Sequence, residues 1–500
     1  MKTVGKMVSY SSGETGKSSA RRKKRLRVLG IIAGGILILA AFLIHAVNTV
    51  KLTETVAVNR NASAVVLENE TINQALLDKI GRLKKLQMLA FRTCVFEEDV
   101  QLGPSVKGGH LSELEINRCS GISEDNYAFL SDAADLKKLI IIGCGVKDGN
   151  IPFERLEALE ELDLSVNPDL TDVSGLKTDK LTSVRLDGTG VEDLSVLADA
   201  EELKILTISG TPVEQAYFIS KLEKLTELNV SGTKIWTFTG KLKSLRLKKL
   251  YAADIPLHSC EAFDNLTILE ELDFSGNGIR EASCIKKSSE TLRKLNLSGC
   301  NPSAELLEAI ADCTGIREID LSGIPLKDLM ILKNMSHLER VRAEGCGLTS
   351  LAGIANKANL AGIYCARNQI QKVSLIPDTG SWISVDLRYN ELTDLSGLPA
   401  NHYGFLALHG NKDVDLRTIP APEGMLIDYV SLDWQDSLDK AESLQKKVTR
   451  LYICGCPDDQ VVALENRLGS KLILTKEEKL DRGIESEGMD PYKWPKDILK

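Results

Sequence analysis

The sequence predicts an α/β solenoid of about 18 coils, with a parallel concave β-sheet and short 3-10 or α segments on the convex side. One observation is a recurring apolar spacing between about residues 62 and 456, as in the copy Leu159, Leu162, Leu164 and Asn167. Another is the period, which is about 22 residues from copy to copy. The third is an aromatic content of only 5%, typical of thin coils filled by Leu, Ile and Val.

We call the residue that ends each copy the ladder residue, and expect it to lie inside its coil and bond backbone groups of the turn. The clear ladder residues are Cys94, Cys119, Cys144, Asn167, Thr189, Thr211, Thr233, Ile255, Asn277, Cys300, Ile324, Cys346, Asn368, Asn390, Asn411 and Cys456. This spacing is that of a leucine-rich repeat, whose strands stack in parallel to form a horseshoe.

The N-terminal region predicts a membrane anchor. Residues 1–27 carry nine Lys or Arg against one acid, Glu14, and predict a basic, disordered cytoplasmic tail. Residues 28–47 lack charged side chains and would form a helix about 30 Å long, which is enough to cross a bilayer. We therefore expect a signal-anchor helix over 28–50 that contacts lipid through 28–47. A cleaved signal peptide is the alternative, although its apolar region would be shorter.

The basic residues before this segment predict the topology. By the positive-inside rule they place residues 1–27 in the cytoplasm and the repeats outside the cell. The expected location is therefore the cell membrane, in a single pass. After a linker at 51–61, the solenoid spans 62–457. A C-terminal cap follows at 458–475 and a charged tail at 476–500. The longer stretch Ser303–Cys313 has room for a true helix.

The chain contains 11 cysteines, and six of them are ladder residues, which gives them a buried structural place. Cys260, Cys284 and Cys313 fall between strands, and their participation in disulfides stays open. Many thiols outside a cell are unusual unless they are bonded. Buried thiols, an anaerobic source and a reversed topology are therefore all kept as alternatives.

Charge and motifs exclude several function classes. The chain has a formal net charge of −8 despite its basic N-terminus, which argues against a nucleic-acid partner. The sequence shows none of the common metalloprotease, serine hydrolase or paired Cys motifs. We therefore expect no enzymatic activity, no cofactor and no metal. An enzyme with an unrecognised site is a remote alternative.

Two groups of side chains are predicted to point outward from the concave sheet, because strand side chains alternate between faces. The middle coils carry an acidic track, suited to a basic partner or to solubility: Glu161, Asp163, Asp187, Glu227, Glu271, Asp273, Glu318 and Asp320. The later coils carry the residue types enriched at binding hot spots: Arg340, Arg342, Tyr364, Arg388, His409, Tyr429 and Tyr452.

Several convex segments share a local pattern, namely Leu170–Leu176, Val191–Leu197 and Leu392–Leu398. With the repeat spacing, they resemble the 22-residue class of bacterial leucine-rich repeats, of which internalins are members. The resemblance covers roughly residues 62–457. Unlike internalins, this chain shows neither a cleaved signal nor a cell-wall sorting motif.

The resemblance implies recognition of a partner by the concave face. The expected function is that of a membrane-anchored, cell-surface scaffold that binds a protein or a glycan. The alternative is a structural component of an envelope assembly without a diffusing ligand. Because one fold hosts many functions, the resemblance does not identify the ligand.

Overall fold

The computed structural model describes residues 49–473 with gaps at 104–110, 239, 258–259, 412–413, 416–417, 421–424, 435–447, 456, 458–459, 461, 464–465 and 467–471. The predicted cytoplasmic tail, residues 28–48 of the predicted anchor, Cys456, most of the predicted cap and the charged tail lie outside these residues. Within the described ranges, no helix has both the length and the apolar character needed to cross a bilayer.

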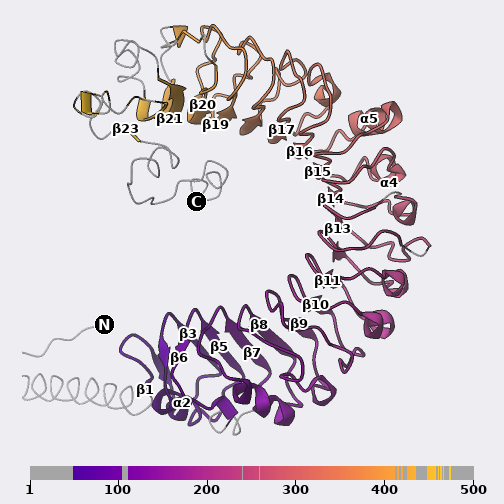
Figure 1. The fold of residues 1–500 in the computed structure, drawn as a ribbon, viewed down its shortest axis with the longest axis vertical. Coiled ribbons are helices and arrows are strands. Elements are labelled where there is room, and N and C mark those ends of the chain that lie inside the picture. The colour runs from indigo at the N-terminus through magenta and orange to yellow at the C-terminus, as the bar shows by residue number, and fades with distance from the viewer. Residues whose placement is uncertain are drawn as a thin grey trace, which may run out of the picture. The chain divides into compact units, whose positions relative to one another are not determined.

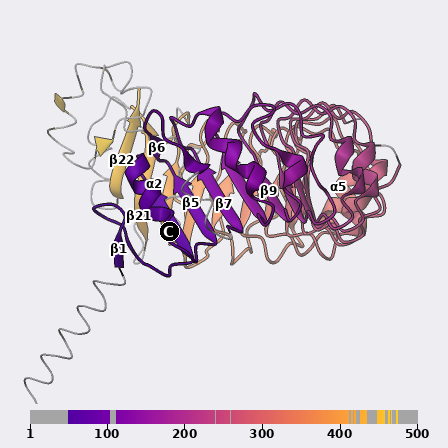
Figure 2. The same cartoon turned by 90° about the horizontal axis from the view of Figure 1, so that it is seen from below.

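The chain divides into two compact units between Leu136 and Lys137. In the first unit, β3, β5 and β7 pair in parallel, and β5 and β7 lie side by side in Figure 2. An antiparallel pair, β1 and β2, covers the end of the predicted anchor and part of the predicted linker, so Thr49 and Val50 lie in a strand and not in the expected helix. The elements are β1 (Thr49–Lys51), β2 (Ala57–Asn59), β3 (Ala64–Glu68), β4 (Thr71–Ile72), α2 (Gln74–Ile80), β5 (Met88–Arg92), β6 (Val95–Phe96), β7 (Glu113–Asn117) and η1 (Glu124–Asp132).

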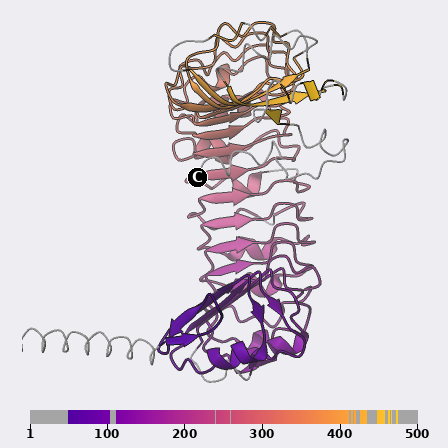
Figure 3. The same cartoon turned by 90° about the vertical axis from the view of Figure 1, so that its left-hand side faces the viewer.

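In the second unit, each strand from β8 to β22 pairs in parallel with the next. Figure 3 shows these strands as stacked rungs, and in Figure 1 α4 and α5 lie on the side of the coils opposite the sheet. The predicted solenoid with a parallel sheet is confirmed.

The strands of this unit are β8 (Lys138–Ile142), β9 (Glu161–Asp163), β10 (Ser183–Arg185), β11 (Ile205–Thr207), β12 (Glu227–Asn229), β13 (Lys249–Tyr251), β14 (Glu271–Asp273), β15 (Lys294–Asn296), β16 (Glu318–Asp320), β17 (Arg340–Arg342), β18 (Gly362–Tyr364), β19 (Trp382–Asp386), β20 (His402–Ala407), β21 (Leu426–Asp433), β22 (Val448–Cys454) and β23 (Leu472–Ile473). The helical segments are η2 (Phe153–Arg155), η3 (Ser195–Asp199), η4 (Tyr217–Lys221), η5 (Glu261–Phe263), α4 (Ser283–Lys287), α5 (Ala304–Ala311) and η6 (Met330–Leu332).

The helix expected within Ser303–Cys313 is present as α5. Ser303 caps it, because its hydroxyl accepts a hydrogen bond from the Leu306 amide at 3.2 Å. Leu306, Ala309 and Ile310 are buried. The Ser303 cap and the buried apolar face therefore hold this short helix on its coil.

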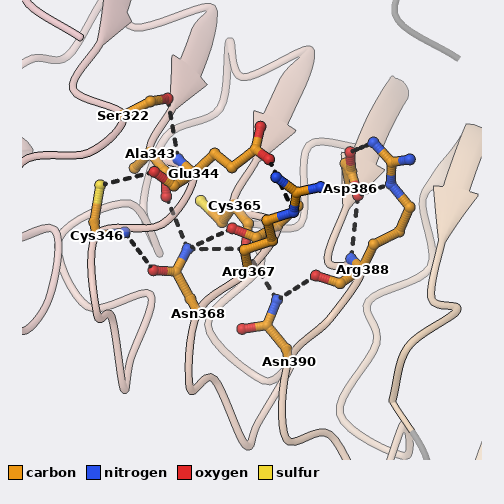
Figure 4. Close-up of polar contacts among 11 residues, drawn as sticks. Ser322, Ala343, Glu344, Cys346, Cys365, Arg367, Asn368, Asp386, Arg388 and Asn390 are labelled. Atoms are coloured by element: carbon orange, nitrogen blue, oxygen red, sulfur yellow. Dashed lines mark hydrogen bonds and ion pairs between the residues drawn. The ribbon is translucent and has the colours of Figure 1, made fainter. Parts of the chain in front are cut away.

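The Asn ladder residues join their coil to the one before it, whereas the Thr ladder residues bond a carbonyl of their own coil, and Ile255 and Ile324 are buried without a polar side chain. The Asn368 side chain accepts hydrogen bonds from the amides of Cys346 (2.9 Å) and Leu348 (3.0 Å). It donates to the carbonyl of Ala343 at 2.8 Å and also to that of Cys365 at 3.0 Å (Figure 4). A buried amide thus satisfies backbone groups that the turn leaves without strand partners.

The residue before each ladder residue repeatedly adopts a left-handed conformation. Many coils use glycine there, such as Gly210 with a φ of 67°. Val166, Arg367 and Tyr389 adopt the same conformation with φ of 64°, 56° and 54°. This position turns the chain sharply at the end of each strand, and non-glycine residues there carry a backbone cost.

Eight of the ten described cysteines are buried. Among these are Cys260, Cys284 and Cys313, whose pairing the sequence left open. Burial raises the pKa of Cys284 and of Cys313 to about 12. These thiols are therefore held protonated and unreactive inside the coils.

Candidate functional site

The outward side of the second unit's sheet, which we call the sheet face, presents two side-by-side columns of side chains. Strand pairing places one residue of each strand from β8 to β19 in each column. The first column contains Lys138, Glu161, Ser183, Ile205, Glu227, Lys249, Glu271, Lys294, Glu318, Arg340, Gly362 and Ser384. The second contains Ile140, Asp163, Arg185, Thr207, Asn229, Tyr251, Asp273, Asn296, Asp320, Arg342, Tyr364 and Asp386.

From Glu227 to Arg340, acidic and basic residues alternate along the first column. Glu161 pairs with Lys138 at 2.6 Å. Glu318 contacts Lys294 at 3.6 Å and forms an ion pair with Arg340. The other two glutamates of the predicted acidic track are also paired, Glu271 with Lys249 at 3.5 Å and Glu227 with Arg185 at 4.0 Å. Its glutamates are therefore neutralised by basic side chains one or two coils away.

The aspartates of the track have a second role, at the ends of the strands. The carboxylates of Asp163, Asp273 and Asp320 accept hydrogen bonds from the amides of the serines two residues later, at 2.9 to 3.0 Å. Asp187 accepts from the Thr207 hydroxyl at 2.6 Å. These Asx turns recur from coil to coil, so the aspartates stabilise the strand ends.

Arg340, Arg342 and Tyr364, which we call the Arg–Tyr cluster, come together on β17 and β18. The Arg342 guanidinium lies 4.8 Å from the centre of the Tyr364 ring and 3.3 Å from the Asp320 carboxylate. A Cβ atom at Gly362 would lie 2.8 Å from the Tyr364 ring. Glycine is needed there because the ring lies across it, which fixes the aromatic side chain on the sheet.

Arg388 differs from its expected exposure. Its side chain is buried, and it donates to both carboxylate oxygens of Asp386, at 2.9 and 2.7 Å (Figure 4). Asp386 also accepts from the Arg388 amide at 3.1 Å. Such a bidentate pair fixes both side chains and removes Arg388 from the accessible surface.

His409 belongs to a group that the sequence reading missed, which we call the edge cluster: Arg367, Tyr389 and His409. Arg367 lies 5.8 Å from the centre of the Tyr389 ring, and the rings of Tyr389 and His409 meet edge-to-face at 5.5 Å. Tyr389 is 49% exposed. The sequence does contain a signal for this group: Arg367 and Tyr389 stand directly before two successive ladder residues, at the position where many coils carry glycine.

Tyr429 and Tyr452 lie further along the sheet. Tyr429 is half-buried on β21, in register with Arg450. Tyr452 is in register with Ser431, and its side chain is outside what the structure describes. The structure therefore brings Arg342 and Tyr364 into contact, places Arg340 beside Gly362 on the neighbouring strand, and puts the two later tyrosines on other strands.

No family model and no curated protein matches the chain. Solved structures match at low identity. An internalin (InlF) of Listeria monocytogenes is 18% identical over 74% of this chain and 92% of its own, with a TM-score of 0.42. The functional domain of InlJ from the same species, which includes a cysteine ladder, is 14% identical over 76% of each chain, with a TM-score of 0.48.

The leucine-rich-repeat ectodomain of an Arabidopsis thaliana membrane receptor kinase, GASSHO1/SCHENGEN3, is 17% identical over 78% of this chain and 57% of its own, with a TM-score of 0.47. At these identities the likeness concerns the fold alone. The repeat spacing, the parallel sheet and the buried ladder residues make this chain a leucine-rich-repeat solenoid.

Proposed function

We propose that the chain is a recognition scaffold that binds a protein partner on the sheet face of β16 to β20. The observation that carries this proposal is the Arg–Tyr cluster, in which Tyr364 lies fixed across Gly362 beneath Arg342. Tyr and Arg side chains bury large areas at interfaces and keep polar groups available. A side chain already held in place loses little conformational entropy on binding.

The charge pattern argues against the acidic track as a site for a basic partner. The carboxylates of the predicted acidic track are engaged by basic side chains or by turns of the same chain. A basic partner would have to break those pairs, which lowers the gain from new ones. Burial raises the pKa of the Tyr364 hydroxyl, so that group stays a neutral hydrogen-bond donor at physiological pH.

We also propose that the scaffold is displayed outside the cell and anchored through residues 28–47. The uncharged segment and the preceding basic cluster support this location. The buried, protonated thiols are compatible with it, because an oxidising exterior attacks exposed thiolates first. Protease added to intact cells should degrade the repeats and spare the N-terminal tail; protected repeats would contradict the topology.

The binding proposal is tested by comparing variants of the full chain after crosslinking in the cells that make it. Arg342→Ala combined with Tyr364→Ala should deplete the copurifying partner, measured by quantitative mass spectrometry. The matched control is Trp236→Ala combined with Leu245→Ala. These side chains are 55% and 62% exposed, in the segment between β12 and β13. Equal recovery from both double variants, at equal thermal stability, would place the binding surface elsewhere.

A further inference from the structure

A pocket of about 510 Å³ opens beside the N-terminal ends of β16 to β19. It is lined by Arg317, His337, Glu339, Ala358, Asn359, Leu360, Ala361, Ser381 and Trp382. Its volume is in the range of small-ligand sites, about 300–1,000 Å³. None of these residues belongs to the Arg–Tyr cluster or to the edge cluster.

The pocket lies beside Ala361, the last member of a column of residues that directly precede the strands, which we call the edge column: Thr182, Lys204, Thr226, Lys248, Glu270, Arg293, Arg317, Glu339 and Ala361. Along the edge of the sheet, the amide of Glu339 bonds the carbonyl of Arg317 at 2.7 Å, and the amide of Ala361 bonds that of Glu339 at 2.8 Å. Earlier positions of this edge column carry ion pairs, such as Lys248 with Glu270 at 2.7 Å. Ala361 ends this series of charged side chains and leaves space next to them.

Trp382 forms an aromatic wall of the pocket, and its position is fixed by the next strand. A Cβ atom at Gly404 would lie 2.1 Å from the Trp382 indole, so the ring packs directly on the glycine backbone. Trp382 is also in register with His402 at the start of β20. The indole is half-buried, which leaves part of its surface facing the pocket.

The polar lining carries little net charge. The Arg317 guanidinium donates to the Glu339 carboxylate at 2.7 Å, so the cation and the anion compensate each other. Asn359 and Ser381 add an amide and a hydroxyl. The pocket therefore combines an aromatic surface with hydrogen-bonding groups that carry little net charge. Such a pocket suits a ligand that has one apolar face of C–H groups and many hydroxyls.

We propose that this pocket binds a neutral pyranose ring, one sugar unit of a glycan, with one ring face against Trp382 and hydroxyls toward Glu339, Asn359 and Ser381. The carboxylate accepts from sugar hydroxyls, while the amide and the guanidinium donate to them. This sugar site shares no residue with the Arg–Tyr cluster that carries the proposed protein binding, and either proposal can fail without the other.

The test uses ligand-detected saturation-transfer NMR on the full chain in detergent. The probes are the methyl glycosides of glucose, galactose, mannose and N-acetylglucosamine at millimolar concentrations. At least one glycoside should bind. Ala361→Glu restores the long charged side chain found at other positions of the edge column. It should fill the pocket and weaken binding at least about tenfold.

Thr226→Glu is the matched control, because Thr226 occupies the same column and is similarly half-exposed. It introduces the same side chain at a coil without the pocket and should leave sugar binding unchanged. Arg342→Ala with Tyr364→Ala should also leave it unchanged. Absence of binding by every glycoside would overturn the proposal, and so would binding that survives Ala361→Glu. Preferential binding of adenosine or N-acetylneuraminic acid would show that the pocket takes a planar or an anionic ligand instead.

Discussion

Replacing the ladder residue Asn368 by alanine should destabilise the coils around it strongly. The Asn368 side chain is the acceptor for the Cys346 and Leu348 amides. An amide left buried without an acceptor costs about 1–3 kcal/mol, so the two together cost roughly 2–6 kcal/mol. The lost donation to the carbonyls of Ala343 and Cys365 adds to this cost.

The expected effect is local, because each coil contacts mainly its neighbours. Hydrogen exchange followed by mass spectrometry is therefore the suitable assay. A loss of 2 kcal/mol or more should speed exchange of amides in residues 340–370 at least about thirtyfold, where exchange requires opening of the coil. Amides in residues 183–213 of the same unit should exchange at the wild-type rate.

Two further variants separate the ladder bond from a general effect of substitution. Asn368→Thr keeps a hydroxyl that can donate as Thr189 does to the Leu186 carbonyl at 2.8 Å, so its effect should be intermediate. Gln369→Ala changes the exposed neighbour and should have little effect. Unchanged exchange in Asn368→Ala would refute the claim that ladder amides hold adjacent coils together.

Three other outcomes are expected. Burial raises the pKa of the Cys300 and Cys346 thiols to about 11. At about pH 8, iodoacetamide should therefore label them slowly until denaturant is added, as measured by peptide mapping. Prompt labelling of the native chain would contradict their burial. Gly210→Ala should lower the free energy of unfolding in urea by about 1–2 kcal/mol, because the φ of Gly210 is 67°, even though a Cβ atom there would meet no other atom. Gly278 has no positive φ and the same open space, so Gly278→Ala should leave the free energy of unfolding nearly unchanged. Glu318→Gln should lower the unfolding free energy by only about 0–1 kcal/mol, with a smaller effect at high salt, and a larger loss would show that the surface pairs matter more than expected.

The regular part of the fold was predictable from one coil. The spacing from Leu159 to Asn167 determines which side chains enter the core, and Leu162 and Leu164 are buried as expected. Alternation along a strand likewise placed Arg342 and Tyr364 on the outward side, in adjacent strands. These features depend on local periodicity, which a single sequence contains.

The chemistry of the site depended on particular side-chain contacts, some within one strand and some between neighbouring strands. The Arg388 side chain is buried against Asp386, although alternation alone places it outward. Tyr364 needs Gly362, and Trp382 needs Gly404 in the next strand. Periodicity says which face a residue occupies, but it does not say how side chains of neighbouring coils lie across one another.

The most direct test of the binding face is site-specific photocrosslinking in intact cells. A p-benzoylphenylalanine residue is introduced in place of Tyr364 on β18, or in place of Trp236 between β12 and β13 as the control. Crosslinks to a defined protein from position 364, with none from position 236, are the result we predict. A partner that crosslinks from position 236 and not from position 364 would contradict recognition by the sheet face.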